Sequence, residues 1–178
     1  MMRAFASSRS RFIVGLVTAS LVAIAVASSV MAGDDLVRQA RAATARFHSV
    51  TQAEQAGYGP FPPGVPLHDC IMALDASSGM GFHWVNGALI DASVDELNPE
   101  VLVYAPRSNG TLELVALEYV IFDSAVPAGT TPTVFGEPMT FVGEGNRYEI
   151  PPFWQRHIWL YEPNEAGLFA DFNPSVSC

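Results

Sequence analysis

The chain has 178 residues, of which 49% are hydrophobic and 15% are charged, and its formal net charge is −9 with neutral histidines. All eighteen acidic residues follow residue 33, where only six of the nine basic residues lie, so the later part carries a charge of 6 minus 18, or −12. Such a chain is repelled by nucleic acids and by anionic membranes, which excludes both as expected partners. The absence of lysine excludes Schiff-base chemistry and lysine general bases.

The first 32 residues have the three parts of a secretory signal peptide. Three arginines without an acid precede an uncharged apolar stretch over residues 13–30, and Val30-Met31-Ala32 follows. Small or modest residues at these last positions suit a signal peptidase, so we expect cleavage after Ala32 and export to the periplasm or the medium. The alternative is an uncleaved membrane anchor, because the uncharged stretch approaches the ~20 residues that span a bilayer.

Residues 33–178 are expected to form a single exported domain of 146 residues, which is long enough for a real core. No segment after the signal is long and apolar enough for membrane insertion. The sequence predicts no oligomeric state.

Residues 34–58 predict one amphipathic helix at the N-terminal end of this domain. Apolar residues recur there at steps of three and four, namely Leu36, Ala40, Ala43, Phe47 and Val50. Two acids suit the helix start and Gly57 suits its C-cap. The proline- and glycine-rich residues 59–66 then predict an extended connector.

Beyond Cys70 the hydrophobic period changes from 3.6 to 2, which is typical of strands. Strands are predicted at 80–86, 101–105, 112–122 and 156–161, with shorter ones at 139–142 and within 127–138. Asn109-Gly110 predicts a hairpin, and residues 162–178 a loop-rich tail. No segment after residue 70 is long enough for a crossover helix. We therefore expect an α+β fold, with the helix on a mainly antiparallel sheet that curls toward a half-open barrel.

Cys70 and Cys178 are the only cysteines of the chain. In an exported protein they most simply form one disulfide. Closing a loop of this length stabilises a protein by as much as about 4.7 kcal/mol in the chain-entropy model. The alternative role as thiolate metal ligands is less favoured, because the close C-x-x-C spacing is absent.

Glu118 stands within the strand predicted at 112–122, on a face that is otherwise apolar. Strict alternation places it beside the side chains of Leu112, Leu114, Ala116, Val120 and Phe122. A carboxylate buried there must meet a cation, a metal ion or hydrogen-bond donors, or else stay protonated.

Two strand histidines, His83 and His157, are candidate partners of Glu118 in a metal site. Two imidazoles and one carboxylate suit Zn²⁺, Cu²⁺ or Fe²⁺. His48 becomes a fourth candidate ligand if the helix packs over the same face. The sequence has no H-x-H or H-E-x-x-H spacing, so the convergence of these residues depends on the strand order. Whether the protein is an enzyme stays open, because metal catalysis requires a coordination position left for water.

The rival interpretation is a structural or interaction protein of the cell envelope without a metal. Glu118 would then be neutralised by a tyrosine or by one of the arginines Arg107, Arg147 and Arg156. No G-x-S-x-G motif supports a serine hydrolase.

Aromatic residues suggest a second kind of site, a pocket for an apolar or sugar-like small molecule. The candidate lining residues are Trp84, Tyr104, Tyr119 and Trp159. The alternative is that these side chains fill the core.

Several segments together resemble an uncharacterised family of exported bacterial proteins. They are ATARFHSV, MGFHWVN, PEVLVYAP, LELVALEYVIF, HIWLYEPN and GLFADFNPSVSC, and they cover most of the chain after the signal. The resemblance implies a single secreted domain and brings no activity, substrate or cofactor with it.

Overall fold

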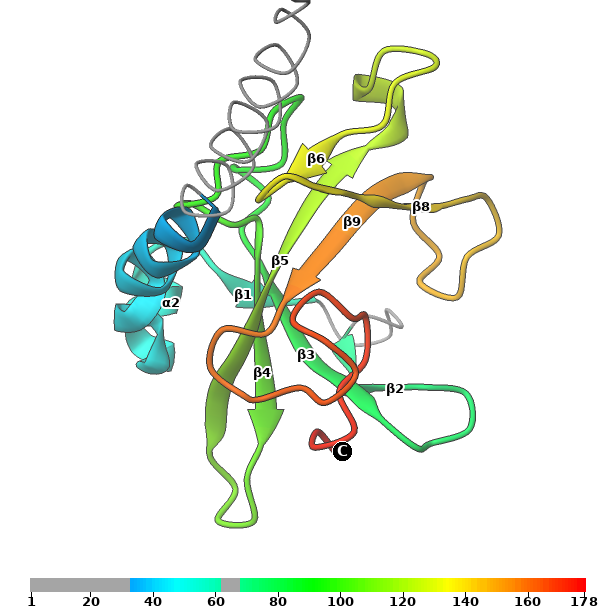
Figure 1. The fold of residues 1–178 in the computed structure, drawn as a ribbon. Coiled ribbons are helices and arrows are strands. Elements are labelled where there is room, and N and C mark those ends of the chain that lie inside the picture. The colour runs from blue at the N-terminus through cyan, green and yellow to red at the C-terminus, as the bar shows by residue number, and fades with distance from the viewer. Residues whose placement is uncertain (1–32, 62–67) are drawn as a thin grey trace, which may run out of the picture. The chain divides into compact units, whose positions relative to one another are not determined.

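The computed structural model describes residues 33–61 and 68–178, and within it Leu36–Cys178 form one compact unit (Figure 1). The signal peptide predicted over residues 1–32 lies outside the described residues. In the part that is described, no helix is both long and apolar enough to cross a membrane.

The predicted helix over residues 34–58 is wrong in one respect, because it is interrupted. Helical backbone over residues 33–44 tightens into the 3-10 helix η1 (Ala45–His48), and α2 (Val50–Gln55) starts after an extended Ser49. The Ser49 side chain accepts a hydrogen bond from the Gln52 amide at 3.4 Å. Serine caps helices better than it continues them, which explains the break.

Gly57 ends α2 as expected. With φ at 94° it lets the Tyr58 amide reach the Ala53 carbonyl and its own amide reach the Glu54 carbonyl, which is a Schellman motif.

The sheet is antiparallel throughout, which confirms the predicted α+β class. Its strands run in the order β1 (Gly59–Pro60), β3 (Gly79–Val85), β4 (Val101–Pro106), β5 (Leu112–Phe122), β9 (Phe153–Ile158) and β8 (Thr140–Val142), and β2 (Ile71–Met72) also pairs with β3. The short strands β6 (Thr133–Val134) and β7 (Glu137–Pro138) form a separate pair, and η3 (Asp123–Ala125) follows β5. The edge strands β1 and β8 do not pair with each other, so the sheet is not a closed barrel.

Strand boundaries match the prediction at β5 and lie within about one residue of it at β3 and β4. The hairpin between β4 and β5 is confirmed, with Gly110 at φ 81° and the Arg107 amide bonded to the Thr111 carbonyl. The last strand, β9, lies at Phe153–Ile158, three residues earlier than the predicted range 156–161. β9 begins directly after Pro152, and Trp159 leaves the ladder to bond the Leu168 carbonyl.

The two faces of the sheet carry separate cores. The helix face packs strand residues such as Trp84, Leu102, Tyr104, Leu117 and Tyr119 against Ala40, Phe47 and Ala53 of the helices. The opposite face, which we call the tail face, packs Val101, Val103, Val115, Val120, Phe153 and Trp159 with Val176 of the C-terminal tail.

A bulge in β5 corrects the strict alternation that the sequence suggested. Val103 pairs with Ala116 whereas Tyr104 pairs with Leu114, so Val115 is an extra residue. As a consequence Leu112 and Leu114 pack with the helix face, while Val115 joins the tail face. Glu118 lies beyond the bulge and keeps its predicted face.

The predicted disulfide between Cys70 and Cys178 is present, with Cα atoms 5.7 Å apart. It ties the last residue to the segment that enters β2. Backbone hydrogen bonds between Asn173 and Gly79 hold the tail against β3 just before the bridge.

Candidate metal centre

Three central strands bring Glu118 together with the two predicted strand histidines. Glu118 of β5 stands directly opposite His157 of β9, and His83 of β3 lies across β4, where it pairs with Val103. Val101 and Val103 of β4 lie between these residues on the tail face, where Val103 pairs with His83 and Val101 pairs with Glu118.

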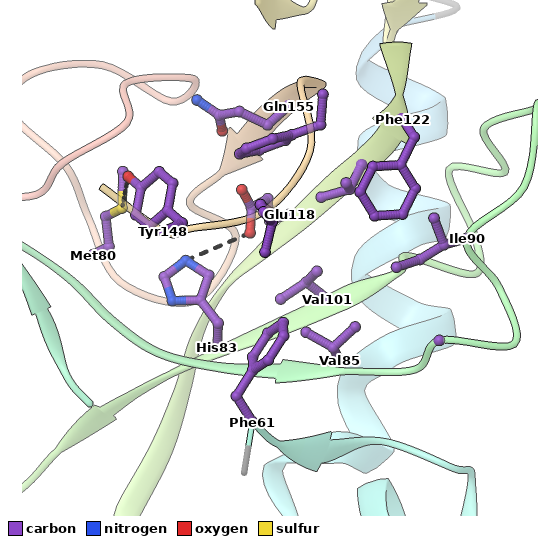
Figure 2. A pocket seen from close by; sticks show the side chains of 14 residues that line it. Phe61, Met80, His83, Val85, Ile90, Val101, Glu118, Phe122, Tyr148 and Gln155 are labelled. Atoms are coloured by element: carbon purple, nitrogen blue, oxygen red, sulfur yellow. Dashed lines mark hydrogen bonds and ion pairs between the residues drawn. The ribbon is translucent and has the colours of Figure 1, made fainter. Parts of the chain in front are cut away.

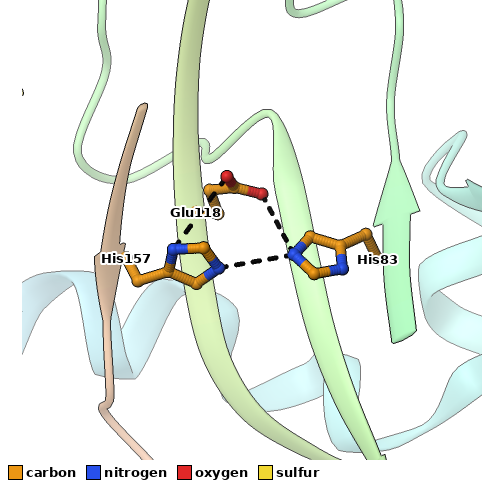
Figure 3. Close-up of side chains that lie close together, drawn as sticks. All are labelled: His83, Glu118 and His157. Atoms are coloured by element: carbon orange, nitrogen blue, oxygen red, sulfur yellow. Dashed lines mark hydrogen bonds and ion pairs between the residues drawn. The ribbon is translucent and has the colours of Figure 1, made fainter. Parts of the chain in front are cut away.

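The ligand atoms of these residues form a tight group, drawn in Figure 3. Nε2 of His83 lies 3.4 Å from Glu118 Oε2 and 3.3 Å from His157 Nε2. One nitrogen or oxygen of each residue lies within 4.8 Å of the others, so the group could hold a metal ion. The residues are 4%, 7% and 0% exposed for His83, Glu118 and His157, respectively.

A hydrogen-bond relay sets the orientation of His157. Asp171 accepts from the Gln155 amide nitrogen at 3.0 Å, which turns the Gln155 carbonyl oxygen toward His157 Nδ1 at 2.9 Å. Nδ1 must then donate, and Nε2 keeps its lone pair on the side facing His83. Such an outer partner is typical of metal-ligating histidines.

His83 has no comparable support on its other nitrogen. Its Nδ1 makes no regular hydrogen bond with any described residue. Burial, followed by the neighbouring His157, lowers the pKa of His83 to about 3, against an opposing effect of the Gly81 backbone. Burial, followed by the charge of Arg156, likewise lowers the pKa of His157 to about 3. Both rings are therefore neutral near pH 7, which is the form that binds metals.

Glu118 is shifted in the opposite direction. Burial raises the pKa of its carboxyl to about 8, and the negative charges of Asp171 and Glu100 add to the effect. At neutral pH the group of three is uncharged without a bound cation. A divalent ion would reverse this balance, because it favours the carboxylate form.

The arginine pairing considered for Glu118 is wrong, since the three candidate arginines have other partners. Arg107 pairs with Glu113 and Glu162. Arg147 donates to the Met72 carbonyl, and Arg156 donates to the carbonyls of Phe169 and Pro138. Histidines are instead the ionisable groups in contact with Glu118.

His48 does not join this group. It belongs to η1, whose Phe47 packs on the helix face, and its ring meets Tyr161 edge-on at 4.6 Å. The condition for a fourth ligand, a helix over the Glu118 face, is therefore not met.

The predicted aromatic pocket is also wrong, because its four residues fill the core. Trp84, Tyr104 and Tyr119 pack on the helix face, where the two tyrosine hydroxyls donate to the carbonyls of Phe47 and Glu96. Trp159 packs in the tail-face core and donates from Nε1 to the Ala170 carbonyl.

A cavity does exist, on the tail face beside Glu118 (Figure 2). Its volume is about 250 Å³, and His83, Glu118 and Gln155 lie in its wall. The remaining lining residues are mostly apolar: Phe61, Met80, Val85, Ile90, Val101, Val120, Phe122, Tyr148, Ile150 and Phe153, with Gly87. Val120 and Phe122 could have been found from their alternation with Glu118. Phe61, Ile90 and Tyr148 come from segments without a strand pattern.

Comparison of the chain with protein-family models, with curated proteins and with solved structures finds no match. The resemblance to a family of exported bacterial proteins therefore stays a prediction.

Proposed function

We propose that this protein is an exported domain that binds one divalent transition metal ion through His83, Glu118 and His157. The observation that carries the proposal is the convergence of two neutral imidazoles and one carboxyl group from three strands, buried together on one face. Buried ionisable groups are costly unless they are paired or bind a metal, and Nδ1 of His83 has no hydrogen-bond partner among the described residues.

The ligand set favours Zn²⁺, Fe²⁺ or Cu²⁺ over the hard cations Mg²⁺ and Ca²⁺, which prefer oxygen ligands. Three protein ligands leave at least one coordination position for water or another molecule. The cavity beside Glu118 gives that position access to a ligand. The site is therefore compatible with metal-dependent catalysis as well as with binding alone.

Export of the protein rests on two features. The signal-like first 32 residues predict secretion to the periplasm or beyond. A disulfide such as the Cys70–Cys178 bridge persists in the oxidising conditions outside the cytoplasm.

Elemental mass spectrometry tests the metal proposal. Tag-free protein is incubated with Zn²⁺, Cu²⁺ or Fe²⁺, desalted and analysed beside Glu118→Gln, His157→Asn and the control His48→Ala. We expect close to one ion per chain in the wild type and in His48→Ala, and little in the two site variants. Equal metal in all four proteins, or none in the wild type, would contradict the proposal.

A further inference from the structure

The cavity on the tail face is apolar except at one end. His83, Glu118 and Gln155, contributed by β3, β5 and β9, form its polar wall (Figure 2). Gln155 touches His157 and Glu118 faces His83, so these polar groups belong to one continuous cluster. A ligand that fills this cavity needs an apolar body with a polar group at one end only.

The size of the cavity limits that body to about one ring. An apolar cavity of ~150 Å³ in a protein core accepts benzene. The present cavity, of about 250 Å³, has room for a monocyclic aromatic or branched aliphatic group with a short substituent.

The net charge of the metal centre determines which polar group the ligand should carry. A divalent ion held by two neutral imidazoles and the Glu118 carboxylate keeps one net positive charge at the edge of an apolar cavity. No other side chain in the cavity wall carries a formal charge among the described residues. A single negative charge on the ligand would balance the metal centre. Asp171, which reaches the site through Gln155, already offsets part of the positive charge and disfavours a dianion.

We infer that this cavity binds a compact apolar monoanion, such as a monocyclic aromatic carboxylate, whose oxygen occupies the open position of the metal ion. The inference rests on the proposed metal site. It adds a substrate or ligand class to that site, whether or not the protein catalyses a reaction.

Val85→Phe is the variant that fills the cavity without touching a metal ligand. Val85 lies two residues after His83 on β3, is partly exposed, and projects into the cavity near Phe61 and Val101 (Figure 2). Leu74→Phe is the matched control, because Leu74 is 94% exposed in the loop between β2 and β3 and lies outside the cavity wall. Ile90→Phe, in the loop after β3, repeats the test should Val85→Phe lower the melting temperature.

The experiment loads the protein with Co²⁺, whose visible absorption reports its ligands, and titrates benzoate, with benzylamine and phthalate as probes of charge. Co²⁺ content is measured first by elemental analysis. We expect benzoate to change the spectrum saturably in the wild type and in Leu74→Phe. In Val85→Phe the new ring occupies space that benzoate would need. The dissociation constant of benzoate should therefore rise by about tenfold or more, while the Co²⁺ content stays unchanged. Benzylamine and phthalate should bind more weakly than benzoate in every variant.

Four other outcomes would overturn the inference. Bound Co²⁺ with no response to benzoate, or with an equal response in Val85→Phe and Ile90→Phe, rejects the ligand class and leaves the metal site standing. Tighter binding of phthalate or benzylamine rejects the charge argument. If the protein binds none of the tested metals, Co²⁺ included, both the metal site and the inference are rejected.

Discussion

The helix face and the tail face of the sheet are built from the same strands, but their buried polar groups have different hydrogen-bond partners. On the helix face the buried hydroxyls of Tyr104 and Tyr119 donate to backbone carbonyls at 2.7 Å. On the tail face Nδ1 of His83 has no hydrogen-bond partner in the part of the chain that the structure describes, and Glu118 lies against nitrogens of His83 and His157, beside a cavity.

This difference separates the features that stabilise the fold from those of the proposed metal site. The helix face is filled by packed apolar and aromatic side chains and pairs its two tyrosine hydroxyls, although Nε of Arg156 on the same face has no hydrogen-bond partner among the described residues. The tail face holds three ionisable side chains whose neutral forms are favoured by desolvation, and they contact one another beside a cavity. Deviations of this kind are expected where a protein binds or reacts.

Removal of the Cys70–Cys178 bridge is the change with the largest expected effect on the tail face. The chain-entropy model gives a loss of up to about 4.7 kcal/mol for a loop of this length. Val176 and the tail should then detach from the tail face, so metal affinity should fall as well. Urea unfolding and metal titration of Cys70→Ser/Cys178→Ser, beside reduced wild type, measure both effects. Unchanged metal affinity would show that the tail is not needed for the site.

Truncation of a helix-face core residue should cost more than truncation of a cavity residue. Leu117 is fully buried, so Leu117→Ala should lower the free energy of unfolding by about 2–5 kcal/mol. Ile90→Ala only enlarges an existing cavity and removes partly exposed surface, so about 1 kcal/mol is expected. Equal losses in urea unfolding would contradict the contrast between the two faces.

Metal binding should stabilise the protein through the tail face alone. With free Zn²⁺ at about 100 times its dissociation constant, the free energy of unfolding should rise by about 2.7 kcal/mol. Glu118→Gln should abolish the gain, whereas Leu117→Ala should retain it on a less stable background. Thermal unfolding at several Zn²⁺ concentrations measures the gain, and a similar gain in Glu118→Gln would place the ion elsewhere.

Metal affinity should depend on pH because Glu118 must lose its proton. The raised pKa of Glu118, about 8, means that protons compete with the metal below pH 8. Affinity should rise by at most about tenfold per pH unit up to pH 8 and then level off. Calorimetry at pH 6.5, 7.5 and 8.5 in buffers of different ionisation enthalpy reports the proton release. A metal affinity that is constant over this pH range would contradict a protonated Glu118 in the metal-free protein.

A pH-dependent effect on stability is expected from Glu100, a second buried carboxyl group, which accepts a hydrogen bond from the Val120 amide at 3.1 Å. Burial raises the pKa of Glu100 to about 7. Because the folded-state pKa exceeds the unfolded one, its contribution to stability is present below pH 4.5 and is lost as pH rises through 7. Glu100→Gln keeps the acceptor, so its melting temperature should match wild type at pH 4.5 and exceed it at pH 8. A difference in melting temperature that is the same at pH 4.5 and pH 8 would contradict the raised pKa of Glu100.

The sequence predicts much of the sheet and part of the site, for identifiable reasons. Apolar segments rich in β-branched and aromatic residues and bounded by turn residues predict β3, β4 and β5, and the apolar surroundings of Glu118 mark it as exceptional. The pairing of Glu118 with His157 depends on strand order, which local pattern does not encode. Both faces of the central strands are apolar, so the sequence could not tell that Tyr104 and Tyr119 lie under the helices, away from the cavity. For the same reason the sequence could not exclude His48 as a fourth metal ligand.

X-ray absorption spectroscopy of the Zn²⁺-loaded protein tests the central claim most directly. Coordination by His83, His157 and Glu118 predicts Zn–N and Zn–O distances of about 2.0–2.2 Å, together with the outer-shell scattering of two imidazole rings. His157→Asn should remove the contribution of one ring. A first shell of oxygen atoms only, without imidazole scattering, would contradict the account and identify adventitious binding to surface carboxylates.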